Sequence, residues 1–267
     1  MRKRRMSLVL SVFMVLLLSL AGCSSAADKG SGTLTVGVRS DIINFGYLNE
    51  TTGNYYGFEI DLARKMAEKL GYEDVEFVPV QPENRKQMLL DGEVDCLIAA
   101  YSISDTRLEN FDFSEPYYVD KMGVMVQKSS LIQEFGQLKG KTVGILNGAN
   151  SGPLLAIKMQ EEGMITEILE HTDEKTVYDN DVTVLNTESY AALSQALETG
   201  AVDAICLDGI IGQTYMDDDR EWLETVVTEQ QYGVATQKGS ELSKSVAKAI
   251  SELSEDGTIE QLRDKWD

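Results

Sequence analysis

The chain has 267 residues, of which 43% are apolar, and it carries a formal net charge of −20. A chain of this length can bury one large core or two smaller ones, so one large domain and two lobes are both open. The strong negative charge excludes nucleic acid as a natural partner, and an acidic ligand would need cations gathered locally to reverse the field.

The N-terminal residues have the pattern of an export signal. Four basic residues, Arg2 to Arg5, precede an apolar run that ends at Cys23 and is short for a membrane span. The phrase LAGC, which ends at Cys23, resembles a bacterial lipoprotein signal. This resemblance implies a signal peptide over residues 1–22, a lipidated Cys23, and a flexible tether that continues to residue 32. An uncleaved anchor and a chance cysteine are the alternatives. In either case we expect an extracytoplasmic protein, anchored to the cell membrane by its N-terminal lipid if Cys23 is modified.

Strand and helix patterns alternate in the first half of the chain. TLTVGV (33–38) predicts a strand, and an apolar face through Leu62, Met66 and Leu70 predicts a helix that ends at Gly71. VEFVPV (75–80), the short helix pattern ENRKQMLL and the buried run VDCLIAA follow. The order βαβαβ predicts a parallel α/β sheet.

The same order restarts in the second half. KTVGIL (141–146) predicts a strand, Ser151 could cap a helix, TESYAALSQALETG is an amphipathic helix, and VDAICLD is a buried strand. The phrases LLDGEVDCLIA and LETGAVDAICL also correspond, because in each a glycine-containing turn and an aspartate precede a buried strand. We therefore expect two lobes that are built alike.

Two similar segments, GVMVQKSS (123–130) and YGVATQKGS (232–240), flank the second half. They predict that the chain leaves a first lobe, builds a second, and returns. The boundaries that follow are residues 33–125 plus 232–267 for lobe 1 and 126–231 for lobe 2. The hinge would lie near Met122 to Gln127 and Gln231 to Ala235, and the terminal helices would pack on lobe 1.

Several phrases, in this order along the chain, carry a family resemblance: TVGVRSD, GFEIDLARKMAEKLG, GEVDCLIAAYSISDTR, FDFSEPYY, LKGKTVGIL, GAVDAICLD, YGVATQKGS and DGTIEQLRDKW. Together they resemble the extracytoplasmic solute-binding proteins of bacterial ABC importers for polar amino acids. The resemblance implies the two-lobed type II periplasmic-binding-protein fold, with a mostly parallel sheet flanked by helices in each lobe and two hinge strands between them. It also implies an amino acid as ligand, an ABC permease as partner, a monomeric chain, and no cofactor.

The resemblance further assigns site residues. Arg107, in AAYSISDTR, would hold the ligand's α-carboxylate, as a guanidinium can do with two parallel charge-assisted bonds. Ala100 and Ser102 of the same segment would lie beside it. Asp208 would hold the ammonium, and Asn150 stands at a helix start where many members have threonine. The alternatives are a surface ion pair of Arg107 with Asp105 or Glu109, and a purely helix-capping Asp208.

Two further arginines bear on specificity. Arg39 in GVRSD and Arg85 in PENRK resemble basic residues of members that bind aspartate or glutamate, and two cations could hold a second carboxylate. We therefore expect an acidic ligand, and glutamine or another polar amino acid is the alternative. For the two arginines themselves, the alternative is that they are solvated surface residues. Which aromatic covers the ligand, Phe45, Tyr47 or Tyr101, is left open.

Other functional classes have less support. Cys96 and Cys206 lie in strand-like runs and are expected to be buried thiols, and the only histidine is His171, so nucleophilic catalysis is not expected. The acid-rich segments lack the spacing of a calcium loop, and no metal site is expected. A cleft enzyme such as a dehydratase, or a sensory lipoprotein, are the alternatives to a transport receptor.

Overall fold

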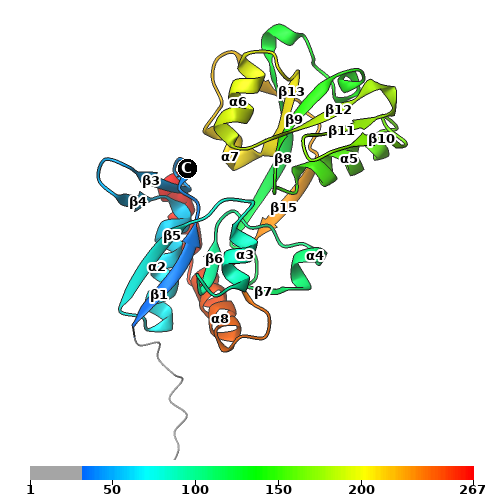
Figure 1. Cartoon of the computed structure of the whole chain (residues 1–267). Coiled ribbons are helices and arrows are strands. Elements are labelled where there is room, and N and C mark those ends of the chain that lie inside the picture. The colour runs from blue at the N-terminus through cyan, green and yellow to red at the C-terminus, as the bar shows by residue number, and fades with distance from the viewer. Residues whose placement is uncertain (1–31) are drawn as a thin grey trace, which may run out of the picture. The chain divides into compact units, whose positions relative to one another are not determined.

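The computed structural model describes residues 32–267, which contain a five-stranded sheet, an eight-stranded sheet and a small three-stranded sheet (Figure 1). The chain from Ser31 to Asp267 forms one compact unit. The predicted signal peptide, Cys23 and nearly all of the tether lie outside the described residues.

The first sheet is built from both ends of the chain. Its strand order is β5 (Asp74–Pro79), β1 (Thr33–Val38), β6 (Cys96–Ile98), β16 (Ala235–Gln237) and β7 (Phe111–Phe113). β1 pairs with β5 and β6 in parallel through the connecting helices α2 (Phe58–Leu70) and α3 (Arg85–Leu90). The predicted βαβαβ unit is therefore confirmed. β2 (Asp41–Ile42), β3 (Gly46–Asn49) and β4 (Asn54–Tyr56) form the small sheet between β1 and α2.

Helix α2 follows the predicted apolar pattern. Leu62 and Met66 are fully buried, and the helix ends at Gly71 with a φ of 84°, a left-handed conformation that glycine adopts at no steric cost. Glu59, in the first turn, is also fully buried on this helix. It is an exception to the rule that carboxylates stay in water.

The second sheet has the order β10 (Ile168–His171), β11 (Lys175–Tyr178), β12 (Thr183–Thr187), β9 (Thr142–Leu146), β13 (Ala204–Asp208), β8 (Tyr118–Gln127) and β14 (Arg220–Trp222). Helices α5 (Ser151–Glu161), α6 (Tyr190–Glu198) and α7 (Gly209–Gln213) connect or follow its strands. Only β12, β9 and β13 are parallel neighbours. Both sheets are therefore mixed rather than mostly parallel. In the first sheet β16 pairs antiparallel with β6 and β7, and in the second β8 pairs antiparallel with β13 and β14, as do β10 and β11 with each other.

The two corresponding sequence phrases form the same hydrogen bonds in the two sheets. In the first, Thr35 N–H donates to Asp95 Oδ2 at 2.8 Å, and Asp95 N–H donates to the carbonyl of Thr35 at 2.8 Å. In the second, Thr142 N–H donates to Asp203 Oδ2 at 2.9 Å, and Asp203 N–H donates to the carbonyl of Thr142 at 2.8 Å. The aspartate before each buried strand is therefore bonded to the neighbouring parallel strand, β1 in the first sheet and β9 in the second, which supports the prediction of two halves built alike.

Two paired strands cross between the halves. Residues 118–122 of β8 pair antiparallel with β15 (Thr228–Tyr232), and the rest of β8 pairs with β13 and β14 in the second sheet. The paired residues, 118–122 and 228–232, thus end close to where the two segments indicated by the sequence begin, at residues 123 and 232.

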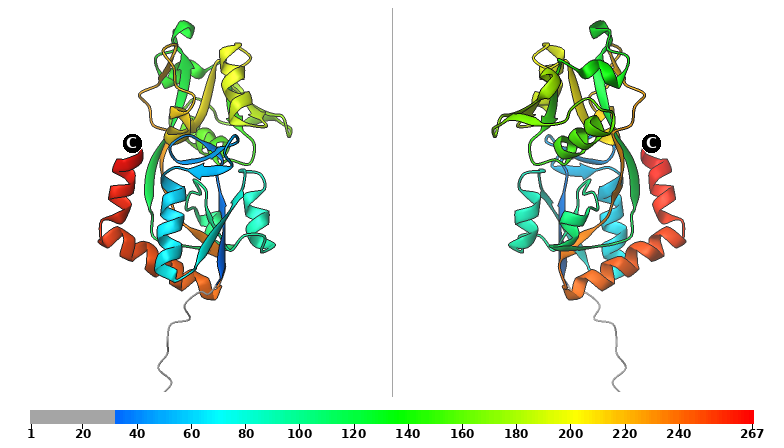
Figure 2. Two further views of the ribbon diagram at one scale, coloured as in Figure 1. Left: turned by 90° about the vertical axis from the view of Figure 1, so that its left-hand side faces the viewer. Right: turned by 90° about the vertical axis from the view of Figure 1, so that its right-hand side faces the viewer.

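The last two helices, α8 (Glu241–Glu255) and α9 (Thr258–Trp266), pack on α2, as predicted (Figure 2). Lys265 Nζ and Trp266 Nε1 both donate to Asp61 Oδ2, at 2.6 and 2.9 Å. The remaining described helices are α4 (Asp105–Leu108) and the short 3₁₀ turns at Lys128–Ser130, Phe135–Leu138 and Asp179–Asp181. Among residues 32–267 no helix is both long enough and apolar enough to cross a membrane.

Candidate functional site

The predicted site residues gather at the carboxyl ends of parallel strands from both sheets. Arg39 follows β1 and Ser102 follows β6, whereas Asn150 follows β9 and Asp208 ends β13. Ligand sites of open α/β sheets occur at such ends. The two sets meet, because Asn150 Nδ2 donates to Ser102 Oγ at 3.0 Å.

Arg107 turns back along α4 towards Ser102. Its Nη1 donates to the carbonyl of Ser102 at 2.7 Å and to Ser102 Oγ at 2.5 Å, and its guanidinium lies 4.1 Å from the centre of the Tyr101 ring. Burial lowers the pKa of Arg107. The guanidinium is thus directed at the hydroxyl of the predicted site and not at Asp105 or Glu109.

Arg85 lies on the other side of Tyr101, with its guanidinium 4.6 Å from the ring centre. It is 5% exposed, and its Nη1 donates to the carbonyls of Ala99 and Ala100 at 2.6 and 3.3 Å. Burial, together with the positive charges of Arg107 and Arg39, lowers the pKa of Arg85 to about 10. Its alternative interpretation as a solvated surface residue is wrong.

Arg39 is fully buried and already meets a carboxylate. Its Nε and Nη2 donate to the two oxygens of Asp41 at 3.0 and 2.6 Å, and Nη2 also donates to Gln81 at 3.2 Å. Burial acts to lower the pKa of Arg39, but the nearby Asp41 and Tyr190 raise it above its ordinary value. Its guanidinium lies 5.4 Å from the centre of the Tyr190 ring, which belongs to α6.

Asp208 is joined to Ser102 by a chain of polar side chains. Gln230 Nε2 donates to Asp208 Oδ1, and Gln230 Oε1 accepts from Asn150 Nδ2 at 2.6 Å. Asp208 is 8% exposed, and burial together with the neighbouring Asp120 raises its pKa to about 6. An amino group placed at Asp208 would therefore interact with a carboxylate poised near neutrality.

Asp208 stands at the N-cap position of α7, yet its side chain makes no capping bond. Asp120, on the neighbouring strand β8, does this instead: its Oδ2 accepts from the N–H of Ile210 at 3.1 Å and from the hydroxyl of Tyr232 at 2.9 Å. The alternative of a purely capping Asp208 is therefore wrong for this geometry, and its carboxylate remains available to a ligand.

The turn at Ala100 is held from two sides. Its N–H donates to Glu59 Oε1 at 2.7 Å, its carbonyl accepts from Arg85, and its φ is 46°, in the left-handed region. Both backbone polar groups of Ala100 are thus bonded within the protein and hold the turn that carries Tyr101 and Ser102, and a contact of Ala100 with the ligand stays a prediction.

The structure answers two smaller expectations. Ser151 begins α5 but does not cap it: Asn150 stands at the N-cap, and Ser151 Oγ is buried without a partner among the described residues.

Of the candidate aromatics, Phe45 is 1% exposed and packs against Phe58, and Tyr47 is 37% exposed, which leaves Tyr101 beside the arginines.

Four side chains of this site were not predicted: Glu59, Asp120, Tyr190 and Gln230. Two of them had a signal in the sequence. Glu59 precedes Leu62, Ala63 and Met66 by three, four and seven residues, so it shares their buried helical face. Asp120 alternates with Met122, Val124 and Val126 on the buried face of β8.

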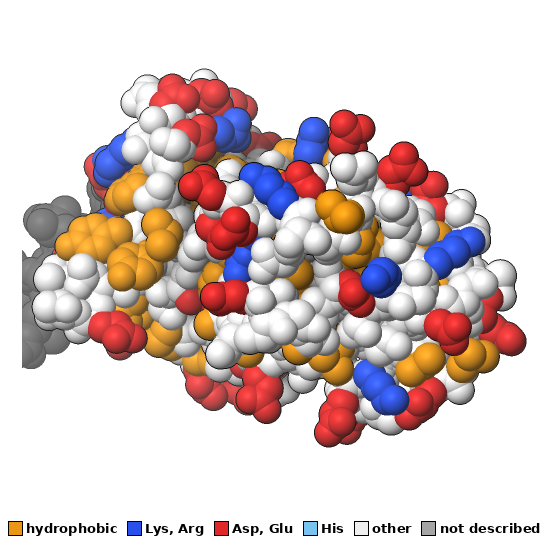
Figure 3. Space-filling model, turned by 90° about the horizontal axis from the view of Figure 1, so that it is seen from above, with side chains coloured by type: hydrophobic (Ala, Val, Ile, Leu, Met, Phe, Trp, Pro, Cys, Tyr) orange, Lys and Arg blue, Asp and Glu red, His pale blue; other side chains and the backbone are white. Residues whose placement is uncertain are grey.

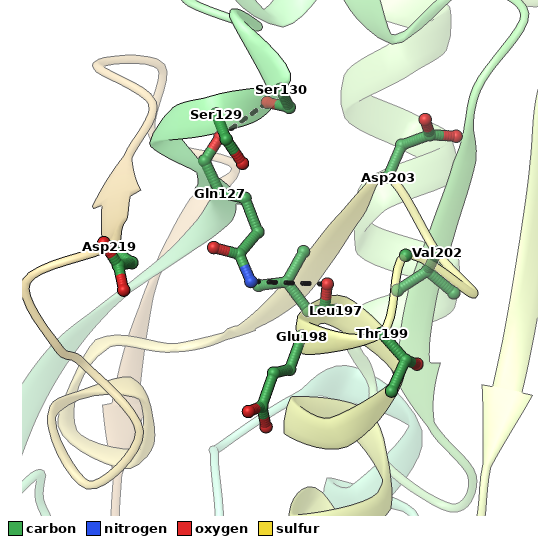
Figure 4. A pocket seen from close by; sticks show the side chains of 10 residues that line it. Gln127, Ser129, Ser130, Leu197, Glu198, Thr199, Val202, Asp203 and Asp219 are labelled. Carbon is green, nitrogen blue, oxygen red and sulfur yellow. Dashed lines mark hydrogen bonds between the residues drawn. The ribbon is translucent and has the colours of Figure 1, made fainter.

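Other features of the described residues carry no comparable chemistry. A hollow of about 550 Å³ lies between the ends of β8 and α6, lined by Gln127, Ser129, Glu198, Asp203 and others (Figure 4), and it contains none of the predicted site residues. Cys96 and Cys206 are buried and free, as predicted. Within residues 32–267 no group of three His, Cys, Asp or Glu side chains could hold a metal ion.

Comparisons with known proteins agree with the fold and the class. The chain is 28% identical to the glutamine-binding protein GlnH of an ABC transporter from Bacillus subtilis (strain 168), over 97% of this chain and 94% of that protein. It is 30% identical to the L-cystine-binding protein TcyJ of Escherichia coli (strain K12), again over 97% and 94%. The structure of an ancestral arginine-binding protein bound to arginine superposes with a TM-score of 0.73, at 30% identity, over 88% of this chain and 98% of that chain.

These similarities confirm the predicted type II periplasmic-binding-protein fold. Residues 34–267 match the description of the bacterial extracellular solute-binding proteins, family 3. With this match and the relatives above, the chain belongs to the bacterial extracellular solute-binding proteins of family 3, among the receptors for polar amino acids.

Proposed function

We propose that this amino-acid-binding receptor of an ABC importer captures an acidic amino acid, glutamate or aspartate. The observation that carries the proposal is Arg85, a guanidinium that is 5% exposed and whose hydrogen bonds among the described residues go only to backbone carbonyls. A buried cation whose hydrogen bonds reach no carboxylate costs free energy, and a ligand carboxylate would offset that cost.

The charges of the site support this assignment. Arg39 and Asp41 compensate each other. An amino acid's own zwitterion would compensate Arg107 and Asp208, with its carboxylate at Arg107 and Ser102 and its ammonium at Asp208. Arg85 is then the cation that remains, and a negative ligand side chain matches it. Acidic side chains, with basic ones between them, are spread over the face seen in Figure 3, and the chain as a whole is negative, so a ligand carboxylate would depend on the positive charge gathered at this site.

The names of the relatives do not decide the ligand. Those proteins are named for glutamine, cystine and arginine, whose side chains are neutral or positive. The assignment to an acidic ligand therefore rests on the residues of this chain, and glutamine is the ligand that would replace it if Arg85 does not face the ligand's side chain.

The remaining parts of the proposal concern delivery. Cys23, in the phrase LAGC, would carry the lipid that holds the receptor at the cell membrane, and the two halves would close over the ligand before a permease accepts it. We propose that the receptor acts as a monomer and that the crossover strands β8 and β15 carry the closure.

Calorimetric titration of residues 28–267, unfolded and refolded to remove any carried ligand, tests the specificity. We expect glutamate or aspartate to bind far more tightly than glutamine. Arg85→Ala should weaken the acidic ligand at least tenfold more than glutamine, because loss of the hydrogen bonds to the Ala99–Ala100 turn affects both ligands alike. Arg64→Ala is the matched control, because Arg64 lies exposed on α2, where it pairs with Asp61. Equal losses for both ligands in Arg85→Ala would contradict the acidic specificity and leave the receptor function in place.

A further inference from the structure

Glu59 is a buried carboxyl group directly behind the ligand-site turn. It is fully buried in the first turn of α2, and its Oε1 accepts two hydrogen bonds, from Ala100 N–H at 2.7 Å and from the Tyr117 hydroxyl at 2.5 Å. Its Oε2 has no hydrogen-bond partner among the described residues. A protonated carboxyl group keeps one oxygen as an acceptor and carries the proton on the other, so both donors can remain on Oε1 when Oε2 is protonated.

Glu59 and Arg85 hold the same residue from opposite sides. Glu59 binds the N–H of Ala100, and Arg85 Nη1 binds the carbonyl of Ala100 at 3.3 Å and that of Ala99 at 2.6 Å. The two groups also interact through their charges, since Arg85 favours the ionised form of Glu59. An ionised Glu59 would therefore compensate Arg85, and a protonated Glu59 would not.

The surroundings place this ionisation near neutrality. Burial raises the pKa of Glu59 to about 7, against the opposing effects of the Tyr117 and Ala100 hydrogen bonds and of the charges on Arg39 and Arg85. The titratable and charged groups that face Glu59 from neighbouring elements are thus Tyr117 ahead of β8, Arg39 after β1 and Arg85 on α3. A group titrating in this range changes charge within ordinary extracellular pH.

Arg85 has charged neighbours of its own. The cations Arg107 and Arg39 and the phenols of Tyr101 and Tyr190 face it. The pKa of Arg39 is raised above its ordinary value, and burial raises that of Tyr190, so both move away from neutrality. Two carboxyl groups near Arg85 have pKa values raised towards neutrality, Glu59 to about 7 and Asp208 to about 6. Of the two, Glu59 lies behind the turn that Arg85 holds, whereas Asp208 belongs to the proposed ammonium site.

We propose that Glu59 determines the receptor's preference for ligand charge. With Glu59 protonated, Arg85 presents an uncompensated positive charge and the site prefers an anionic side chain. With Glu59 ionised, the pair is neutral and the preference moves towards a neutral side chain such as that of glutamine. The inference rests on the proposed function, in which the ligand's side chain lies at Arg85.

The ratio of two dissociation constants tests the proposal. Residues 28–267 are titrated with glutamate and with glutamine between pH 5.5 and 8.5, as wild type, as Glu59→Gln and as the control Glu68→Gln, whose side chain is 72% exposed on the same helix. Effects on the shared carboxylate and ammonium sites cancel in the ratio. Asp208 also interacts with Arg85 through its charge, and the comparison of the wild type with Glu59→Gln, in which Asp208 is unchanged, separates its contribution from that of Glu59.

In the wild type and in Glu68→Gln, the preference for glutamate over glutamine should fall about tenfold as the pH rises through 7. In Glu59→Gln it should stay at the low-pH value throughout. A flat ratio in the wild type overturns the proposal without any variant, so it remains testable if Glu59→Gln fails to fold. An equal loss of both ligands in Glu59→Gln, with the wild-type pH curve retained, would show that Glu59 only supports the turn. Binding of neither ligand by the wild type would instead contradict the proposed function.

Discussion

The carboxylate of Asp120 accepts the hydrogen bond from the backbone N–H of Ile210 at 3.1 Å, although Asp208 occupies the N-cap position of that helix. A residue on a neighbouring strand thus satisfies the helix start, and Asp208 is free to point its oxygens elsewhere. Capping by a carboxylate and its use as a ligand compete for the same atoms. The structure resolves that competition with a second aspartate.

Replacement of Asp120 tests this division of roles. Asp120→Ala removes the acceptor of both the Ile210 N–H and the Tyr232 hydroxyl, so we expect the free energy of unfolding to fall by about 1–3 kcal/mol. Asp120→Asn, which keeps one oxygen acceptor, should lose less. Urea unfolding of the two variants beside the wild type measures the difference, and equal stabilities of Asp120→Ala and wild type would contradict the capping role.

Arg107→Ala should abolish binding of every amino acid. Its guanidinium, held at 2.7 Å from the carbonyl of Ser102, is the predicted partner of the α-carboxylate that all amino acids share. We expect a loss of at least a hundredfold in affinity, with Arg107→Lys recovering part of it, because a lysine supplies the charge but not two parallel bonds. Calorimetry across acidic and neutral ligands checks this. Selective loss of acidic ligands alone would assign Arg107 to side-chain recognition instead.

Affinity for every amino acid should decrease in acid. Asp208 must be ionised to hold an ammonium, and burial with the neighbouring Asp120 raises its pKa to about 6. Below that pH a bound ligand must first displace a proton, so affinity should fall about tenfold per pH unit. Titrations at pH 5.5 in two buffers of different ionisation enthalpy should reveal release of a proton on binding. Affinities that stay constant between pH 5 and 7 would be inconsistent with Asp208 as the ammonium partner.

Glu59 should also make the ligand-free protein less stable as the pH rises. Its pKa is about 7 when folded, against an ordinary value of 4.5, so the folded state holds more protons between these values. The stabilisation is complete below pH 4.5, falls as the pH rises towards 7, and then levels off, with a total of about 3 kcal/mol. Urea unfolding at several pH values measures this slope.

Glu59→Gln should reduce that slope, and Glu68→Gln should not. The buried Asp208 contributes a slope of the same sign, because its pKa is raised as well. The comparison between the two variants therefore isolates the share of Glu59. An undiminished slope in Glu59→Gln would show that other groups account for it.

The parts of the site that sequence reasoning found are those encoded locally. Arg107 and Ser102 lie five residues apart after a buried strand, and Arg39 and Asp208 directly follow or end theirs. A strand end fixes the direction in which such residues emerge, so their place in the site follows from the strand pattern. The βαβαβ order of the first half followed from periodicity in the same way.

The parts that were missed depend on contacts distant in sequence. Glu59 meets Ala100 across 41 residues, and Gln230 meets Asn150 across 80. Likewise, the pairing of Arg39 with Asp41 and the choice of Asp120 as a cap depend on side-chain rotamers and strand register. Helical and strand periodicity marks such acids as buried but does not say which group they will contact.

The crossover between the halves has a further mechanical meaning. β8 and β15 are paired from Tyr118 and Tyr232 to Met122 and Thr228, and at the middle of this ladder Asp120 stands opposite Gln230. Asp120 caps the helix that Asp208 precedes, and Gln230 bonds Asp208 itself. If the two halves close over a ligand as proposed, the paired strands that join them must change their twist or bend about this central pair. Asp120 and Gln230 would then couple the geometry of the ribbon to the proposed ammonium site at Asp208.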